Sequence, residues 1–296
     1  MKEKAKSIGT VFGYLMVYLG IQLGINFVIQ VVAVVNVAIG MEESAYYELM
    51  NSGEAFSQIV LEMVKPYTFY VVLICDLMVL GIIWLVAKCR KQKLRDKIWI
   101  KKINTKIVGL SVLIGIGVYA FNIGVVEILG NIELFRLSYA ALQDVSSIIK
   151  EMPFAIGIMI VGIIAPFIEE VLFRGIIFQA LKKNFDIAIA IVVQGLIFGL
   201  VHMNGIQVVY ATLIGIVCGY VVYRTGSIWS GVIIHIVNNC ISCLYTYMNM
   251  GENGIFYSVI VILMILGVGC IGIGIYSINR VEIKNKVGVE MTKTFE

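Results

Sequence analysis

Long apolar runs constrain the fold of this chain more than any other feature of its sequence. A helix needs about 20 consecutive apolar residues to cross the hydrocarbon core of a bilayer. Segments of about this length occur at residues 8–38, 67–88, 107–129, 153–180, 187–203, 206–223, 228–247 and 255–278. The chain is 60% hydrophobic and only 14% charged, whereas about a quarter of a soluble domain is charged. The sequence therefore predicts an all-α, polytopic membrane protein with about eight transmembrane helices.

The connections between these segments are too short to hold a sizeable soluble domain. We therefore expect a single transmembrane domain over 1–296, with N-terminal helices and a basic loop over roughly 1–149. A core over 150–250 and a last helix with its tail over 251–296 would complete it. The first apolar run is too long for a signal peptide and lacks a convincing cleavage site, which favours a retained helix. The Glu-rich outer segment 41–66 is expected to form a solvated, partly helical cap.

Basic residues are concentrated in every second connection. Nine Lys and Arg lie between residues 88 and 106 alone, and most of the others are in the N-terminus, the C-terminal tail and alternate connections. By the positive-inside rule, this bias predicts that both termini are cytoplasmic, in agreement with an even number of helices. The net charge of +4 then indicates topology and contact with anionic lipid rather than nucleic-acid binding.

The fourth segment contains ionisable residues in the stretch PFIEEVLFRG, residues 166–175. Such side chains are expensive at the bilayer centre and usually face the interior of the helix bundle. Glu170 and Arg174 are four residues apart, so they share a helix face and can pair. Glu169 lies about 100° further around the helix. We therefore expect one glutamate to be held by arginine and the other to be free for chemistry.

The two histidines of the chain also fall within predicted helices. Phe198 precedes His202 by four residues in FGLVH, and Asn239 follows His235 by four residues in HIVNN. Asn238 lies near the same helix face as His235, so Asn239 is favoured without excluding its neighbour.

The predicted topology places Glu169, His202, His235 and Asn239 at a similar depth, roughly 12–22 Å from the cytoplasmic surface. A carboxylate in such a pocket can act as a general base toward water, with a neighbouring histidine positioning that water. A second histidine and an amide can donate hydrogen bonds to an oxyanion. The set predicts hydrolysis of a peptide bond without a serine or cysteine nucleophile.

Zinc is the main alternative, because histidine and carboxylate side chains are common zinc ligands. Its ligands would be Glu169, His202 and His235. The sequence contains no HExxH motif, and Arg174 beside the carboxylates disfavours a bound cation. We therefore expect no cofactor, with zinc as the alternative, and with purely structural helix-to-helix contacts as a further possibility.

The three motifs together resemble a known family, the CAAX-protease and bacteriocin-processing (CPBP, or Abi) intramembrane proteases. The family motifs EExxxR, FxxxH and HxxxN/B stand here as EEVLFR (169–174), FGLVH (198–202) and HIVNN (235–239). The preceding stretch YRTGSIWSGVIIH also resembles the family, and the resemblance covers roughly 150–245.

This resemblance implies a helical bundle like that of the CAAX prenyl endopeptidase of the endoplasmic reticulum. It implies that Glu169 activates water with His202, and that His235 and Asn239 form the oxyanion site. Glu170 and Arg174 would support the centre structurally, together with the Phe of the second motif, Phe198. We expect the site to open toward the cytoplasm.

The substrate would be a peptide or a membrane protein in a cell membrane. The composition, rich in Ile and Lys, favours a bacterial source, where the family is linked to bacteriocin processing, self-immunity and membrane-protein processing. A non-catalytic immunity or scaffold protein is one alternative. A proton-coupled carrier is another, although the inverted repeats or broken helix pairs typical of carriers are not evident.

Other polar and small residues are expected to have structural roles. We expect Asp76 to bond a neighbouring helix, or else to line the cavity, and Glu127 to reach the membrane interface. The thiols of the CxxC at 240–243 are expected to be buried. Three glycine pairs are expected at close helix crossings, namely Gly20/Gly24, Gly195/Gly199 and Gly215/Gly219.

Overall fold

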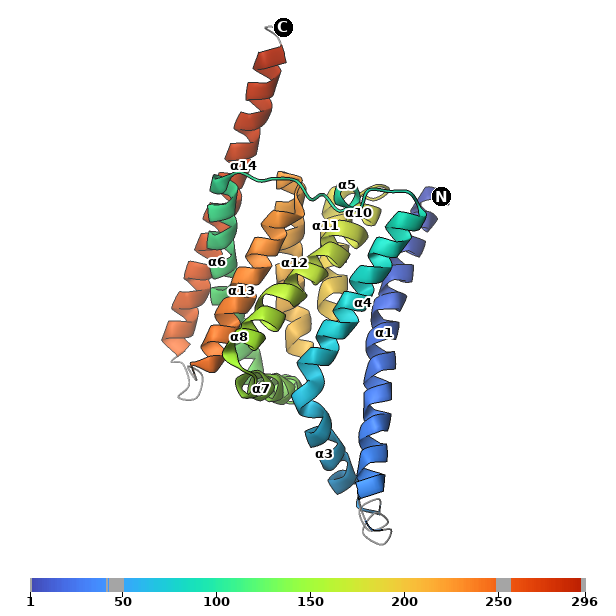
Figure 1. Ribbon diagram of the computed structural model, residues 1–296. Coiled ribbons are helices and arrows are strands. Elements are labelled where there is room, and N and C mark those ends of the chain that lie inside the picture. Colours follow the sequence, from blue (N-terminus) through green and yellow to red (C-terminus); the bar gives the residue numbers. More distant parts are fainter. Residues whose placement is uncertain (1, 41, 43–50, 249–256, 294–296) are drawn as a thin grey trace.

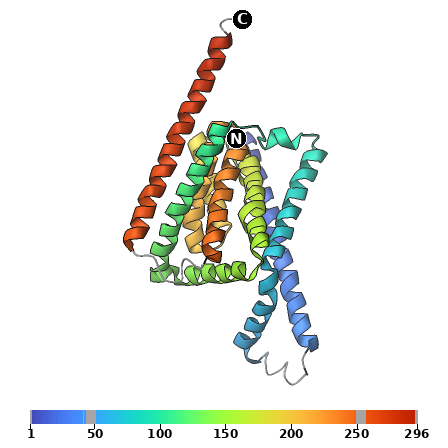
Figure 2. The same cartoon turned by 60° about the vertical axis from the view of Figure 1, so that its left-hand side comes forward.

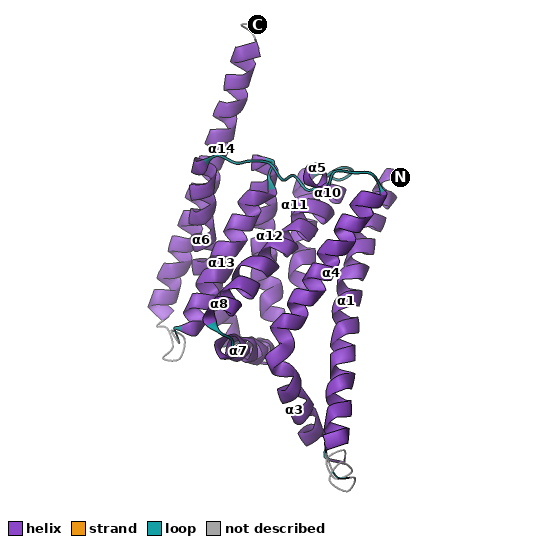
Figure 3. Ribbon diagram, viewed as in Figure 1, coloured by secondary structure: helices purple, strands orange, loops and turns teal. Residues whose placement is uncertain are grey.

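A computed structural model describes residues 2–40, 42, 51–248 and 257–293. Helices joined by short connections make up this described part, which contains no β-strand (Figure 3). The predicted all-α fold class is therefore confirmed.

Among the described residues, seven helices are long and apolar enough to cross a membrane, so the chain is a multi-pass membrane protein. They are Lys2–Gly40 (α1), Ala55–Cys89 (mainly α4, Thr68–Cys89), Thr105–Gly130 (α6), Phe154–Leu181, Gly205–Thr225 (α12), Ile228–Tyr247 (α13) and Tyr257–Val281 within α14 (Tyr257–Lys293). The N-terminal end of α1, the C-terminal end of α14 and the connection between α4 and α6 lie at the same end of the bundle (Figure 1). We call this end the terminal face.

The predicted fifth transmembrane helix, 187–203, is shorter than expected. Helix α11 spans Ile187–Leu200, which is 14 residues and about 21 Å at 1.5 Å per residue, and so is shorter than each of the seven helices above. It ends before His202, which lies in the turn that leads into α12. The sequence did not reveal this end, because the residues that follow Leu200 are themselves partly apolar.

Helices α11 and α12 pack closely through glycines. A Cβ atom added to Gly215 would lie 2.6 Å from the Cα of Gly195, and one added to Gly219 would meet the side chain of Gln194. The expected close crossing of these two helices is confirmed. The same expectation is wrong for Gly20 and Gly24, where an added Cβ would meet no atom within 4 Å.

The helix that carries the EExxxR motif is not a regular α-helix. Two π-helical stretches, η3 (Ile158–Ile164) and η4 (Val171–Ile177), flank the short α9 (Ala165–Glu170), between α8 (Phe154–Gly157) and α10 (Phe178–Leu181). Pro166 lacks the N–H that would continue the α-helical hydrogen bonds. π-helical turns are rare and occur frequently at functional sites. This segment is also the most buried of the chain, since every residue of η4 is buried.

An amphipathic helix that was not predicted, α7 (Arg136–Glu151), lies across the end of the bundle opposite the terminal face (Figure 2). The backbone carbonyl of Ser138 accepts a hydrogen bond from Asn204 at 2.8 Å, and the hydroxyl of Ser146 lies 3.3 Å from that of Thr246. Helix α7 is therefore attached to both the α11–α12 turn and α13. The sequence-based search for long apolar runs overlooked it, because half of its surface is polar.

The remaining elements agree in part with the expected boundaries. The outer segment 41–66 contains a helix, α3 (Gly53–Val64), followed by a short turn, η1 (Lys65–Tyr67), whereas residues 41 and 43–50 lie outside the described residues. Residues 255 and 256 of the predicted last helix also lie outside them. Short helices α5 (Leu94–Lys97) and η2 (Glu133–Phe135) occupy the two connections around α6.

Candidate active site

An ion pair closed off from solvent lies at the centre of the bundle. Glu170 and Arg174 are both 0% exposed, and Nη1 of Arg174 lies 2.7 Å from Oε1 of Glu170. The expected pairing of these residues is therefore confirmed. The guanidinium carbon of Arg174 also lies 4.5 Å from the centre of the Phe198 ring. Arg174 thus joins the first motif to the second.

His235 connects this ion pair to Glu169. Its Nδ1 lies 3.1 Å from Oε1 of Glu170, and its Nε2 lies 3.7 Å from Oε2 of Glu169. Because a carboxylate oxygen accepts hydrogen bonds, Nδ1 carries the proton in the first contact. The sequence suggested no link between His235 and Glu170, since helix spacing relates only residues of the same helix.

The two adjacent glutamates occupy different environments. Glu170 has no exposed surface, whereas 17% of the Glu169 side chain is exposed and lines a cavity. Glu170 is committed to Arg174 and His235, so Glu169 is the carboxylate that a substrate or a water molecule can reach. This difference agrees with the division of roles expected from their angular separation.

His202 is oriented by the backbone one turn before it. Its Nδ1 lies 2.8 Å from the carbonyl oxygen of Phe198, and a carbonyl oxygen only accepts hydrogen bonds. Nδ1 therefore carries a hydrogen, which leaves the Nε2 of a neutral ring as an acceptor. The Phe198 ring also stands edge-on to the rings of His202 and His235, with ring centres 5.1 and 5.5 Å apart. Phe198 thereby packs against both histidines.

Three asparagines form a hydrogen-bonded chain beside the histidines. The amide of Asn122 donates to Asn238 at 3.2 Å, Asn238 donates to Asn239 at 2.9 Å, and Asn239 donates to the carbonyl of Val161 at 3.1 Å. Asn238 and Asn239 both line the cavity, so the structure retains both as candidates. Asn122 on α6 was missed, because it lies outside every motif. The sequence feature that could have identified Asn122 is a side-chain amide within an otherwise apolar helix.

The cavity that contains these residues has a volume of about 530 Å³. Its lining includes Glu169, Phe198, His202, His235 and the asparagines, and further residues from α6, α7, α12 and α13. The α7 residues Gln143, Val145 and Lys150 are both part of the lining and exposed. The cavity therefore reaches the surface at α7.

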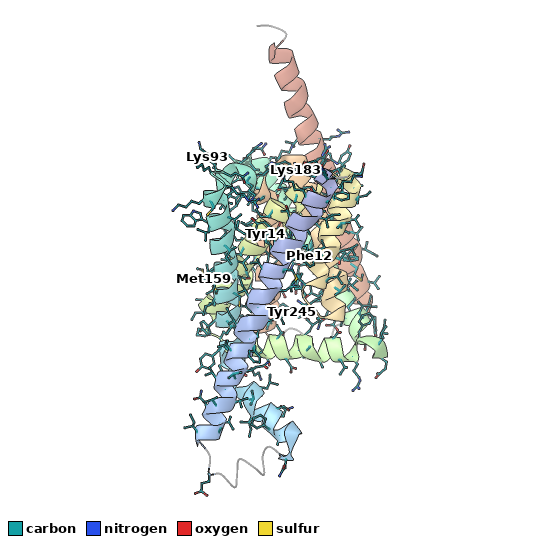
Figure 4. The ribbon with its side chains drawn as sticks, turned by 90° about the vertical axis from the view of Figure 1, so that its right-hand side faces the viewer. Phe12, Tyr14, Lys93, Met159, Lys183 and Tyr245 are labelled. Carbon is teal, nitrogen blue, oxygen red and sulfur yellow. The ribbon has the colours of Figure 1, made fainter. Side chains whose placement is uncertain are left out.

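The direction of this opening corrects an expectation. With both termini cytoplasmic, the site was expected to open toward the cytoplasm, but α7 lies opposite the terminal face (Figure 2). Figure 4 shows Tyr245, which lines the cavity, toward the α7 end and Lys93 and Lys183 at the other end. Depth along a helix indicates how far a residue lies from each face, but the neighbouring helices decide on which side the space is open.

The acidic residues outside the motifs differ in their relation to the cavity. Asp76 is buried on α4 and is not among the residues that line the cavity. Its Oδ1 has no hydrogen-bond partner among the described residues, so the expected bond to a neighbouring helix is not observed. Glu127 lines the cavity, so it does more than reach the membrane interface. In the CxxC, Cys243 is buried and Cys240 partly buried, both as free thiols.

The fit of a metal can be judged from the side chains that are present. Within the described ranges, no group of three or more His, Cys, Asp or Glu residues could hold a metal ion, the set Glu169, His202 and His235 included. As placed in the structure, these three side chains are therefore not arranged as a set of zinc ligands.

Residues 151–241 match the family of type II CAAX prenyl endopeptidases described as Rce1-like. This match supports the resemblance of the three motifs to the CPBP family over this segment. All residues of the three motifs lie within it.

A curated protein of Bacillus subtilis (strain 168), "Putative membrane peptidase YdiL", is 28% identical to this chain over 134 residues. The similar region covers 45% of this chain and 55% of that protein, so the chain matches only about half of the length of this relative. No solved structure matches the chain. The matched segment contains the motif residues that line the cavity, whereas α6 and α7 contribute lining residues from outside it.

Proposed function

We propose that this protein is an intramembrane endopeptidase that hydrolyses a peptide bond with a water molecule activated by Glu169 and His202. The observation that carries this proposal is the convergence of three motifs on one cavity. Glu169, His202 and His235 come from three separate segments and all line it. Glu170 and Arg174 are sealed behind them.

Glu169 would act as the general base. Its carboxylate accepts a proton from water while the water oxygen attacks the carbonyl carbon of the substrate, which gives a tetrahedral oxyanion. The free Nε2 of His202 can accept a hydrogen bond from the same water and so orient it. The proton on Glu169 then passes to the leaving nitrogen as the C–N bond breaks, which restores the carboxylate.

His235 and Asn239 would stabilise the oxyanion. Nδ1 of His235 already donates to Glu170, so a second donor at Nε2 requires the doubly protonated ring, and Glu169 and Glu170 flank that ring. The amide of Asn239 uses one N–H for Val161 and retains a second. A pair of such donors near a developing negative charge typically contributes a large part of catalysis.

We propose a mechanism without a metal, because Glu169, His202 and His235 are not arranged as a set of zinc ligands. Zinc content per chain, measured on purified active protein, tests this step. We expect well below one equivalent of zinc, and activity that survives dialysis against a chelator. Stoichiometric zinc, with activity lost on chelation and restored by zinc alone, would favour the zinc-dependent subtype.

We further propose that the substrate reaches the site from the extracytoplasmic side of a bacterial cell membrane. Two observations support this direction: the basic residues are concentrated at the terminal face, and the cavity opens at the opposite end, at α7. Peptides or membrane-protein segments exposed on that side fit this access, and bacteriocin processing or self-immunity would be one use.

Access can be tested with a cysteine at the exposed lining residue Gln143. In intact cells, a membrane-impermeant maleimide should label Gln143→Cys more strongly than the parent chain. Labelling only after permeabilisation would place α7 in the cytoplasm and reverse the proposed direction.

The reaction itself is tested by comparing new peptide termini in membranes that express either the wild type or Glu169→Gln at equal levels. Glu133→Gln serves as the matched control, because this carboxylate is 86% exposed and pairs only with surface Arg136 among the described residues. We expect cleavage products with the wild type and the control but not with Glu169→Gln. If all three gave the same termini while accumulating normally, a non-catalytic immunity or scaffold protein would be the better assignment.

A further inference from the structure

A second cavity lies at the terminal face, away from the CPBP site. Its volume is about 800 Å³, and none of its lining residues is shared with the first cavity. Its lining residues come from the N-terminal turns of α1, the connection that follows α4, and the chain around the end of α10. These segments lie at the same end of the bundle in Figure 1.

The lining of this cavity is strongly cationic. Five basic residues contribute to it, namely Lys6, Arg90, Lys97, Lys182 and Lys183, and Glu3 is its one acidic residue. None of these five cations forms an ion pair with a carboxylate of a described residue. The cavity therefore concentrates a net positive charge.

The basic side chains lie close enough together to lower the pKa values of two of the lysines. Burial and the neighbouring charges of Arg90 and Lys183 lower the pKa of Lys97. Burial, with Lys101 and Lys183, lowers the pKa of Lys182 to about 8. Like charges brought together in this way destabilise the protonated forms, and a bound anion would relieve the repulsion.

The walls of the cavity are fixed by specific contacts. Ser7 donates to the carbonyl of Ala180 at 2.7 Å, and Asn184 donates to Ser7 at 2.8 Å. Nζ of Lys182 lies 3.3 Å from the centre of the Trp99 ring. Trp99 has a φ of 58°, a conformation that is uncommon outside glycine and persists when the surroundings enforce it.

The loop that carries Trp99 is in turn fixed to the helices of the matched segment. The carbonyl of Trp99 accepts from the backbone N–H of Ile228 at 3.1 Å, and that of Lys101 accepts from the hydroxyl of Ser227 at 2.6 Å. Ile98 packs on Gly175, where an added Cβ would lie 2.8 Å from the Ile98 Cβ. The basic residues of this loop are therefore held in place rather than free to separate.

We propose that this cavity is a binding site for a phosphate-bearing anion. Lysine and arginine donate charge-assisted hydrogen bonds to phosphate oxygens, and the five cations surround a space larger than one phosphate group. Because the cavity lies at the end of the membrane-spanning helices, the phosphate could belong to the headgroup of an anionic phospholipid or to a soluble phosphate compound. Both sources present the same chemistry to the site.

The test uses the full chain purified in a neutral detergent and reconstituted into phosphatidylcholine nanodiscs with or without phosphatidylglycerol. Lipid retained by the protein is measured by native mass spectrometry, and pyrophosphate serves as the soluble probe by calorimetry. The variant Lys97→Gln/Lys182→Gln removes the two partly buried cations. Lys4→Gln/Lys93→Gln is the matched control, since it removes the same charge from residues that do not line the cavity.

We expect the cavity variant to bind its anion about tenfold or more weakly than the wild type, because two charge-assisted contacts are lost. The control should bind like the wild type, and Lys97→Arg/Lys182→Arg should retain binding, which separates lost charge from misfolding. Since the anion favours protonated Lys182, binding should weaken as the pH rises through about 8.

The two arms identify the source of the phosphate. Retention of phosphatidylglycerol in the presence of pyrophosphate indicates a lipid site, whereas displacement by pyrophosphate, or binding of pyrophosphate alone, indicates a soluble phosphate compound. Equal binding of both probes by the wild type, the cavity variant and the control would overturn the proposal. These readouts do not depend on peptidase activity.

Discussion

Replacing Arg174 with Ala would leave the carboxylate of Glu170 buried without its cation. Both side chains are 0% exposed and 2.7 Å apart, so bulk solvent does not compensate for the lost guanidinium. Removal of one partner of such a pair typically costs about 3–5 kcal/mol. The lost contact with the Phe198 ring, 4.5 Å from the guanidinium carbon, adds up to about 2 kcal/mol for a desolvated cation–π pair.

The matched comparison is Arg136→Ala. Arg136 pairs with Glu133 at 3.0 Å, but their side chains are 72% and 86% exposed, and exposed pairs contribute less than about 1 kcal/mol. The assay is thermal unfolding of detergent-purified protein, together with its abundance in membranes. We expect Arg174→Ala to accumulate poorly and to unfold at a clearly lower temperature than Arg136→Ala.

A second variant separates lost charge compensation from lost packing. Arg174→Met/Glu170→Gln removes both charges and keeps most of the buried volume, so its stability should exceed that of Arg174→Ala. If Arg174→Ala accumulated and unfolded like Arg136→Ala, the argument that a stranded Glu170 destabilises the core would be refuted.

Three further predictions concern the same region. Gly231→Ala should lower the unfolding temperature, because an added Cβ would lie 2.6 Å from Oε2 of Glu170. The control is Gly81→Ala, where an added Cβ would meet no atom within 4 Å. This control should leave the free energy of unfolding unchanged or raise it by up to about 1 kcal/mol. Asn122→Leu should lower kcat up to about tenfold with little change in KM, as expected for one lost buried hydrogen bond; an unchanged kcat would remove the asparagine chain from the mechanism. His202→Ala should reduce kcat by about 10²–10⁴ while the protein still accumulates, and a matching loss of folded protein would indicate a structural role instead.

The geometry of single helices could be predicted well from the sequence. The apolar runs gave helices whose ends agree within a few residues for most segments, and the i, i+4 spacing gave the Glu170–Arg174 pair. These features depend on residues close together in the chain, where the helical rise and turn fix the distances. The predicted end of the fifth helix, residue 203, lies three residues beyond the observed end of α11 at Leu200.

Contacts between helices were much harder to predict. Sequence patterns placed Glu169, His202 and His235 at similar depth, but the link from His235 to Glu170 and the chain that begins at Asn122 depend on how helices rotate against each other. The amphipathic α7 was not predicted, and with it the opening of the cavity was missed.

The sequence alone thus determined the membrane-spanning, all-helical class and the residues that meet in the core, because helix length and the cost of burying charge are local properties. Only the tertiary structure decided that His235 lies between Glu169 and Glu170, that Phe198 packs against both histidines, and that the cavity opens at α7. Each of these depends on the packing of segments far apart in the chain. The cationic cavity at the terminal face has the same origin, since three distant segments bring its lysines together.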